Sequence, residues 1–246
     1  ATESYLNINA ILSAAVLTEA EAIHPGFGFL SENSKFATMC EEVGIKFIGP
    51  SARVMDVMGD KINARAQMIQ ANVPVIPGSD GEVHTAEEAL AIAEKIGYPV
   101  MLKASAGGGG KGIRKVEKAE DLVSAFETAS SEAKANFGNG AMYLERVIYP
   151  ARHIEVQILA DQMGHVIHLG ERDCSLQRNN QKVLEESPSI AIGKTLRHEI
   201  GSAAVRAAES VHYENAGTIE FLLDEATGKF YFMEMNTRVQ VEHPVT

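Results

Sequence analysis

The chain has little of what marks secreted, membrane or nucleic-acid-binding proteins. Its 246 residues include only two cysteines, Cys40 and Cys174, which form no CxxC pair and are too few for a disulfide scaffold. We therefore expect both thiols to be reduced, as in the cytoplasm. The 22 Lys and Arg are outnumbered by 33 Asp and Glu, which argues against a general nucleic-acid binder. No apolar stretch is long enough to span a bilayer and no signal or transit segment is recognisable, so we expect no membrane contact.

What is present predicts a globular protein with helices and strands. Hydrophobic residues make up 45% of the chain, enough for one large core or two smaller ones. Residues 1–58 alternate helical patterns with short strands near 21–23 and 46–48, which suggests part of an α/β layer. Ser31 is a candidate cap for the helix between them.

Turn-forming residues at 77–81, after a helix at 60–71, are expected to link two domains. Thr85 begins a capping box and a helix that runs to Gly97. Strands are expected at 99–103, 113–116 and 142–145, with a helix before the last of them. From 154 onward the pattern is mainly strands at 154–159, 166–170, 218–223 and 230–235, interrupted by one helix at about 194–212.

A glycine-rich turn at 106–112 joins two of these strands. Consecutive glycines let backbone N–H groups approach an anion closely, and Lys111 adds a positive charge. The turn is not a P-loop, because Lys111 is followed by Gly112 and a strand. A phosphate-binding loop and an ordinary hairpin turn both fit this pattern.

Two glutamates are predicted to face each other across a hairpin. If the strands at 218–223 and 230–235 pair about Thr227, Glu220 lies directly opposite Glu234, with Cβ atoms roughly 5 Å apart. Such carboxylates repel unless they are protonated or bridged by a cation. Their apolar neighbours favour a buried Mg²⁺ site over a solvated sheet face.

A row of polar residues with a period of two continues past Glu234. If the segment is extended, one face carries Asn236, Arg238, Gln240 and Glu242. Arginine can grip a planar oxyanion and a glutamate can take a proton. The alternative is a polar edge strand in water.

Several isolated cations and histidines lie outside charged runs. Lys61, Lys103 and Lys182 stand beside glycine, alanine or apolar residues, and Lys103 ends a strand just before the glycine-rich turn. His24 and His153 have no zinc-ligand spacing to partners. Taken singly, each is better explained by a surface or structural role than by a site.

Seven motifs in order make the resemblance to one family specific. They are HPGFGFLSEN (24–33), MGDK (58–61), KASAGGGGKG (103–112), RHIE (152–155), ERDCSLQ (171–177), QK (181–182) and EMNTRVQVEHPVT (234–246). Together they resemble biotin carboxylase, a subunit or domain of acetyl-CoA carboxylase or a related biotin-dependent carboxylase. The resemblance covers essentially the whole chain.

The resemblance implies the ATP-grasp fold, of α/β and α+β class, with a partial Rossmann-like N-terminal domain. The implied domains are that N-terminal part at 1–58, a linker helix region at 59–75, a lid at 76–148 and the first part of the C-terminal sheet subdomain at 149–246. ATP would lie between the lid and the sheet. Compared with the family the chain is expected to be cut at both ends, and we expect this piece alone to bind Mg-nucleotide weakly and not to carboxylate biotin.

The resemblance also implies a set of site residues. Nucleotide contacts would come from Lys61, Lys103, Gly109, Gly110, Glu145, Arg146, Val147, Ile148, His153, Gln177, Glu220 and Glu234. Mg²⁺ or Mn²⁺ would be held by Glu220, Glu234 and Asn236, which agrees with the facing-strand argument. Bicarbonate would be held by Lys182, Arg238, Gln240 and Val241, of which Lys182 and Arg238 would also be catalytic, and Glu242 would be the general base.

The implied reaction is the ATP-dependent carboxylation of biotin on a biotin carboxyl carrier protein. Bicarbonate would attack the γ-phosphorus of ATP to give carboxyphosphate, which yields the CO₂ that deprotonated biotin takes up; this is mainly a matter of positioning and charge neutralisation. A carboxyltransferase would be a further partner, and the parent protein would be a homodimer in the cytoplasm.

Two departures and two alternatives accompany this interpretation. Ala106 stands where family members often have glycine, and Asn180 where many have histidine. One alternative is the bicarbonate-phosphorylating half of a carbamoyl-phosphate synthetase, against which the motifs at 152–155 and 171–175 weigh. The other is a non-catalytic nucleotide-binding fragment, against which the retention of Lys182, Arg238 and Glu242 weighs.

Overall fold

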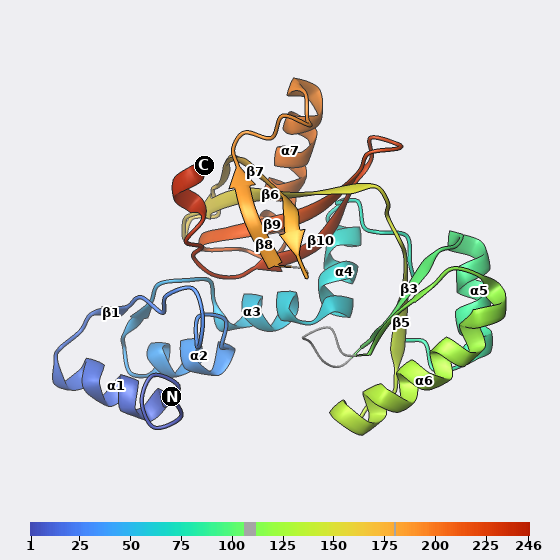
Figure 1. Cartoon of the computed structure of the whole chain (residues 1–246). Coiled ribbons are helices and arrows are strands. Elements are labelled where there is room, and N and C mark those ends of the chain that lie inside the picture. The colour runs from blue at the N-terminus through green and yellow to red at the C-terminus, as the bar shows by residue number, and fades with distance from the viewer. Residues whose placement is uncertain (106–111, 180) are drawn as a thin grey trace. The chain divides into compact units, whose positions relative to one another are not determined.

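The computed structural model describes residues 1–105, 112–179 and 181–246 of the chain (Figure 1). It contains both helices and sheets. The chain forms two compact units, the first made of Ala1–Pro74 with Ala151–Thr246 and the second of Val75–Pro150. The four functional domains expected from the sequence remain a prediction.

The N-terminal part of the first unit combines four helices with a small parallel pair of strands. The helices are α1 (Ile8–Leu17), α2 (Ser34–Glu42), α3 (Ala52–Gly59) and α4 (Lys61–Gln70). The strands β1 (Ala22–Ile23) and β2 (Lys46–Phe47) pair in parallel where the sequence predicted them. A buried apolar cluster, which includes Phe36 and Cys40 of α2, holds this part together.

The cap of α2 differs from the prediction. The Asn33 side chain accepts a hydrogen bond from Phe36 N at 2.8 Å, so Asn33 and not Ser31 caps the helix. Ser31 is instead buried in the preceding loop. Both residue types cap helices well, so sequence preference could not separate them.

The main body of the first unit is a five-stranded antiparallel sheet in the order β10-β9-β6-β7-β8. Its strands are β6 (Ala151–Ala160), β7 (Val166–Arg178), β8 (Gln181–Glu186), β9 (Asn215–Asp224) and β10 (Phe230–Asn236). Helix α7 (Lys194–Ser210) packs on β6 and β7 and buries a stripe of small residues that includes Ala203, Ala204 and Ala207. A short 3-10 helix, η1 (His243–Val245), follows β10. The sequence predicted four of these strands and α7, and it missed β8.

The second unit is a three-stranded antiparallel sheet covered by two helices. The strands lie in the order β4-β3-β5, with β3 (Val100–Ala104), β4 (Ile113–Val116) and β5 (Met142–Arg146). Helices α5 (Ala86–Ile96) and α6 (Ala119–Phe137) share an apolar core with the sheet (Figure 1). The predicted capping box is confirmed, since Thr85 and Glu88 each bond the other's backbone N–H. Within the described ranges, no helix combines the length and apolarity that a bilayer crossing requires.

Candidate active site

The predicted pair of facing carboxylates is present in the β9–β10 hairpin. Glu220 of β9 lies directly opposite Glu234 of β10. The reason includes a feature that the sequence did not reveal, because the register shifts by one residue between Phe232 and Glu234. Without this bulge, the register at the turn would have placed Met233 opposite Glu220 and turned Glu234 to the other face.

A third carboxylate and an arginine extend this row across the sheet. Glu155 of β6 pairs with Glu220, and Arg172 of β7 pairs with Glu155, so all four side chains belong to one face. Glu155 and Arg172 are fully buried, and Glu220 is 3% exposed. Buried like charges at this spacing require opposite charges or hydrogen bonds to stabilise them.

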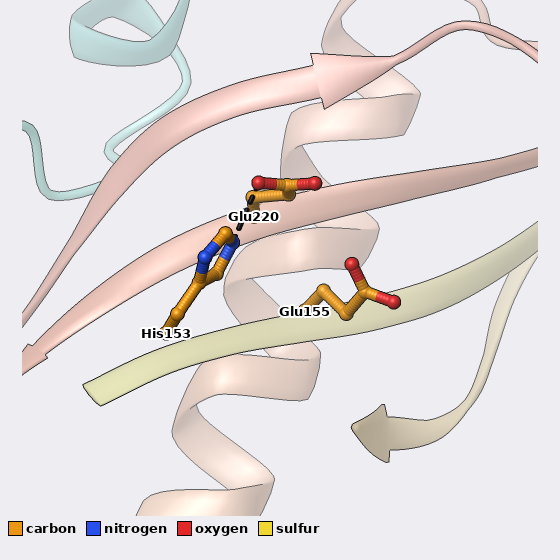
Figure 2. A group of neighbouring side chains, drawn as sticks. All are labelled: His153, Glu155 and Glu220. Carbon is orange, nitrogen blue, oxygen red and sulfur yellow. Dashed lines mark hydrogen bonds and ion pairs between the residues drawn. The ribbon is translucent and has the colours of Figure 1, made fainter. Parts of the chain in front are cut away.

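Glu220 receives three hydrogen bonds that keep it ionised. His153 Nε2 lies 2.5 Å from Oε2, as Figure 2 shows, while Lys182 Nζ and Asn236 Nδ2 lie 2.9 and 2.7 Å from Oε1. Burial by itself would raise the pKa of Glu220. The hydrogen bond from His153, together with the charge and hydrogen bond of Lys182, outweighs that effect and lowers the pKa to about 2.

Lys182 bridges two carboxylates of the row. Its Nζ donates to Glu155 Oε2 as well as to Glu220 Oε1. Desolvation would lower the pKa of the ammonium group, but the charges of Glu220 and Glu155 raise it well above the usual value. Lys182 is therefore a permanent positive charge placed between Glu155 and Glu220.

The tautomer of His153 is set by Gln177. Gln177 Nε2 lies 3.0 Å from Cys174 O and 2.7 Å from His153 Nδ1, and because the carbonyl can only accept, this Gln177 atom is a donor. Nδ1 of His153 then accepts, which leaves the proton of the neutral ring on Nε2, facing Glu220. Two predicted nucleotide contacts, His153 and Gln177, thus act together on the central carboxylate.

The residues present fit a divalent cation at the hairpin. Glu234 is exposed, so the expectation that both glutamates are buried is wrong for this one. Partial desolvation and the neighbouring charge of Glu220 nevertheless raise its pKa, and Lys61 at the start of α4 only partly offsets this. A cation between the two carboxylates would relieve that repulsion. Asn236 bonds Glu220 through Nδ2, which leaves its Oδ1 for an ion, and Mg²⁺ prefers such oxygen donors.

An overlapping group of possible ligands lies beside this pair. His153, Glu155 and Glu220 offer atoms within 4.8 Å of one another, on the same side of the strands in Figure 2. His153 already donates to Glu220, and Glu155 is already held by Lys182 and Arg172. The Glu220–Glu234 side of the group is therefore the better place for a cation.

The polar row beyond Asn236 is not extended, so that prediction is wrong. Strand β10 ends at Asn236, because Thr237 leaves the ladder and its N and Oγ1 bond Glu32 Oε1 at 3.0 and 3.2 Å. Arg238 forms an ion pair with the other oxygen of Glu32 at 3.3 Å. A single glutamate about 200 positions earlier in the chain thus ends the strand, a contact that no local pattern could reveal.

The predicted bicarbonate residues adopt different environments. Gln240 is buried and bonds Arg172 and Thr218, whereas Val241 is 60% exposed. Burial raises the pKa of Glu185 of β8, and the negative charges of Glu155 and Glu242 raise it further. Of the predicted set, Lys182 and Gln240 therefore join one hydrogen-bond network, through Glu155 and Arg172.

The nucleotide contacts predicted in the second unit lie on two neighbouring strands and the segment after them. Lys103 of β3 forms an ion pair with Glu145 of β5. Its Nζ also lies over the ring of Tyr143, the residue opposite it on β5, 5.5 Å from the ring centroid. Arg146 ends β5, and the half-buried Val147 and Ile148 follow it. Gly109 and Gly110 lie outside the described residues.

Glu155 and Arg172 were missing from the predicted site. Both occur in motifs that carried the family resemblance, but no role was assigned to them. A signal was available for Glu155, since His153, Glu155 and Gln157 alternate with Ile154 and Val156, the same period of two that drew attention to Glu234. For Arg172 the sequence offers no comparable signal.

Two protein-family models match this chain. The model of the "Carbamoyl-phosphate synthase L chain, ATP binding domain" family matches residues 60–246, and that of the "Biotin carboxylase, N-terminal domain" family matches residues 1–55. The fold is that of an ATP-grasp protein, with helices and sheets as in the solved members of that fold.

The relatives decide the family. The biotin carboxylase of Nostoc sp. strain PCC 7120 is 58% identical over 244 residues, and biotin carboxylase 1 of Bacillus subtilis is 54% identical over the same length; each match covers 99% of this chain and 54% of the relative. The chain belongs to the biotin carboxylase family. It spans about half the length of the curated relatives it matches.

Solved structures give the same result. The Campylobacter jejuni biotin carboxylase in its β,γ-ATP complex aligns with a TM-score of 0.91 at 55% identity, over 100% of this chain and 55% of that one. The biotin carboxylase domain dimer of the Hydrogenobacter thermophilus 2-oxoglutarate carboxylase, in complex with MgADP, ADP and bicarbonate, aligns with a TM-score of 0.87 at 54% identity, over 98% of this chain and 53% of that one.

Proposed function

We propose that the protein containing this chain carboxylates biotin on a carrier protein, using ATP and bicarbonate. The observation that carries the proposal is the row of Glu155, Glu220 and Glu234 on one face of the sheet, in which Glu155 and Glu220 are buried, Glu234 is exposed, and Lys182 bridges the two buried members. Such a cluster has a large desolvation cost, which a purely structural sheet avoids by burying apolar residues. A site that handles polyanions and a metal requires these charges.

The chain's own residues divide into three sets in this proposal. Nucleotide contacts are assigned to Lys61, Lys103, Gly109, Gly110, Glu145, Arg146, Val147, Ile148, His153 and Gln177. Glu220, Glu234 and Asn236 hold Mg²⁺ or Mn²⁺, which when bound neutralises phosphate charge. Lys182, Arg238, Gln240 and Val241 hold bicarbonate, and Glu242 is its base.

The reaction is proposed in three steps. Glu242 removes a proton from bicarbonate, and a bicarbonate oxygen forms a bond to the γ-phosphorus while the bond to ADP breaks. The resulting carboxyphosphate breaks its C–O bond to release CO₂ and phosphate. The biotin ring nitrogen, having lost its proton to phosphate, forms the new N–C bond with CO₂. Lys182 and Arg238 stabilise the negative charge of the oxyanions through these steps.

The surroundings of the reaction are also proposals. The partners are a biotin carboxyl carrier protein, a carboxyltransferase and a second copy in a homodimer, of which the Hydrogenobacter thermophilus domain dimer is an example. The location is the cytoplasm, although a Populus trichocarpa relative 56% identical to this chain is chloroplastic. Fatty acid synthesis through acetyl-CoA carboxylase is the proposed pathway.

Phosphate release by the complete protein tests the proposal. We expect release that requires bicarbonate and is stimulated by free biotin, and we expect Glu242→Gln to suppress it while leaving ATP binding intact. Stimulation by ammonia in place of biotin would support a carbamoyl-phosphate synthetase instead. Bicarbonate-dependent release at the parental rate in the Glu242→Gln variant would show that the base is assigned wrongly.

A further inference from the structure

All five N–H groups of the Arg172 guanidinium have an acceptor, although the side chain is fully buried. Nε donates to Glu155 Oε1. The other four donate to Gln157 Oε1 at 3.0 Å, Thr246 Oγ1 at 2.7 Å, Thr218 Oγ1 at 3.3 Å and Gln240 Oε1 at 2.7 Å. A lysine has only three N–H groups, so no other side chain can satisfy this set of acceptors.

The contact with Gln240 determines which way its amide points. A guanidinium can only donate, so the atom of Gln240 that meets Arg172 must be the oxygen. Thr218 Oγ1 adds a second hydrogen bond to the same Oε1 at 2.7 Å. With Oε1 held on the protein side by two donors, the NH₂ group of Gln240 is the part left to donate to a ligand.

The same guanidinium also acts on Lys182. Glu155 binds Arg172 with Oε1 and Lys182 with Oε2, so the position of this carboxylate determines where the ammonium group lies. Two donors from distant parts of the chain, Lys182 of β8 and Gln240 after β10, therefore depend on one residue of β7.

We infer that Arg172 is the positioning residue of the bicarbonate subsite: it orients the Gln240 amide as a hydrogen-bond donor and, through Glu155, places Lys182. The inference rests on the proposed function, because it takes Lys182 and Gln240 as bicarbonate ligands. Arg172 itself does not touch the anion. It makes the subsite favour an anion, because an amide turned the other way would present its oxygen and repel one.

Steady-state kinetics of the complete protein test this inference. Arg172→Lys should raise KM for bicarbonate by about tenfold, the effect of one lost charge-assisted hydrogen bond, while KM for ATP changes by less than about twofold. Arg197→Met is the matched control, because Arg197 also bonds a carboxylate, Glu171, but contacts none of the proposed site residues. An unchanged KM for bicarbonate in Arg172→Lys would overturn the inference. So would a change in the KM for bicarbonate that is as large in Arg197→Met as in Arg172→Lys.

A spectroscopic readout separates this inference from the proposed function. The side-chain NH₂ resonances of Gln240, identified by their loss in Gln240→Glu, should shift in both Arg172→Met and Thr218→Val of the 246-residue chain, and should stay in place in Arg197→Met. If the complete wild-type protein shows no bicarbonate-dependent turnover, the proposed function fails, yet these resonances still report whether Arg172 orients the amide. If the Gln240 NH₂ resonances stay in place in Arg172→Met, Arg172 does not orient the amide, whatever the enzymatic activity of the complete protein.

Discussion

The sheets of the two units bury side chains of opposite kinds. In the second unit, Leu102 and Leu144 of adjacent strands are fully buried against α5 and α6 in an apolar core. In the first unit, Glu155 and Arg172 are buried just as completely on one face of the five-stranded sheet. An apolar core forms wherever the burial pattern repeats, whereas buried charges are stable only with specific partners. The core of the second unit therefore depends on packing alone, whereas the charged face of the first unit's sheet depends on every partner being in place.

Removing a charge from the row should have the largest effect. Glu155→Gln leaves Lys182 and Arg172 without their shared carboxylate, so we expect the free energy of unfolding to fall by about 3–5 kcal/mol. Urea denaturation followed by circular dichroism measures this. The control is Glu186→Gln on β8, an exposed acid whose loss should change stability by less than about 0.5 kcal/mol. Equal effects of the two changes would mean that the buried row contributes nothing to stability.

An apolar truncation in the second unit should be nearly as costly. Leu102→Ala removes a fully buried side chain from β3, and we expect a loss of about 2–5 kcal/mol from lost burial and the cavity that remains. Val123→Ala on α6, where the side chain is 39% exposed, is the control and should cost far less. Urea denaturation at low and high salt sharpens the comparison, since the Leu102→Ala effect should not depend on salt. A strong salt dependence would contradict a purely apolar core.

The metal site should separate binding from stability. Glu234→Gln removes one of two repelling charges, so we expect MgADP to bind about tenfold more weakly while the free energy of unfolding stays equal or rises. Isothermal titration calorimetry and urea denaturation measure the two effects. The control is Glu225→Gln, in the turn of the same hairpin, which should leave the affinity for MgADP unchanged. Unchanged MgADP affinity in Glu234→Gln would place the cation elsewhere.

The smallest effect is expected at a helix cap of the second unit. Thr85→Ala removes the side-chain half of the capping box at α5, and we expect a loss of about 1 kcal/mol. Thermal unfolding detects this, with Thr128→Ala in the middle of α6 as the control, where the hydroxyl bonds only a backbone oxygen of its own helix. A loss as large as that of Leu102→Ala would show that the second unit depends on its caps more than on its core.

The sequence predicted those parts of the fold that depend on neighbours along the chain. The capping box at Thr85, the turn glycine at Gly97 and the strands on either side of the glycine-rich turn all follow from patterns of fewer than ten residues. The cap of α2 shows the limit of such reasoning, since Ser31 and Asn33 compete and only the structure selects Asn33.

The candidate site was predictable in part for the same reason. The sequence predicts the opposition of Glu220 and Glu234 correctly, but the observed register also requires the bulge before Glu234, which the sequence does not reveal. The row beyond Asn236 was predicted to be extended, and it is not, because Glu32 binds Thr237 and Arg238.

By itself, the sequence determined which residues carry charge and where local signals such as the capping box at Thr85 begin a helix, because these depend on residues close together along the chain. Only the tertiary structure decided that β8 pairs with β7 and brings Lys182 to Glu155, and that Arg172 meets acceptors from four other segments. Those contacts join residues up to 74 positions apart. Their partners are chosen by the requirement that every buried charge be satisfied, a condition that holds over the folded structure and leaves no period in the sequence.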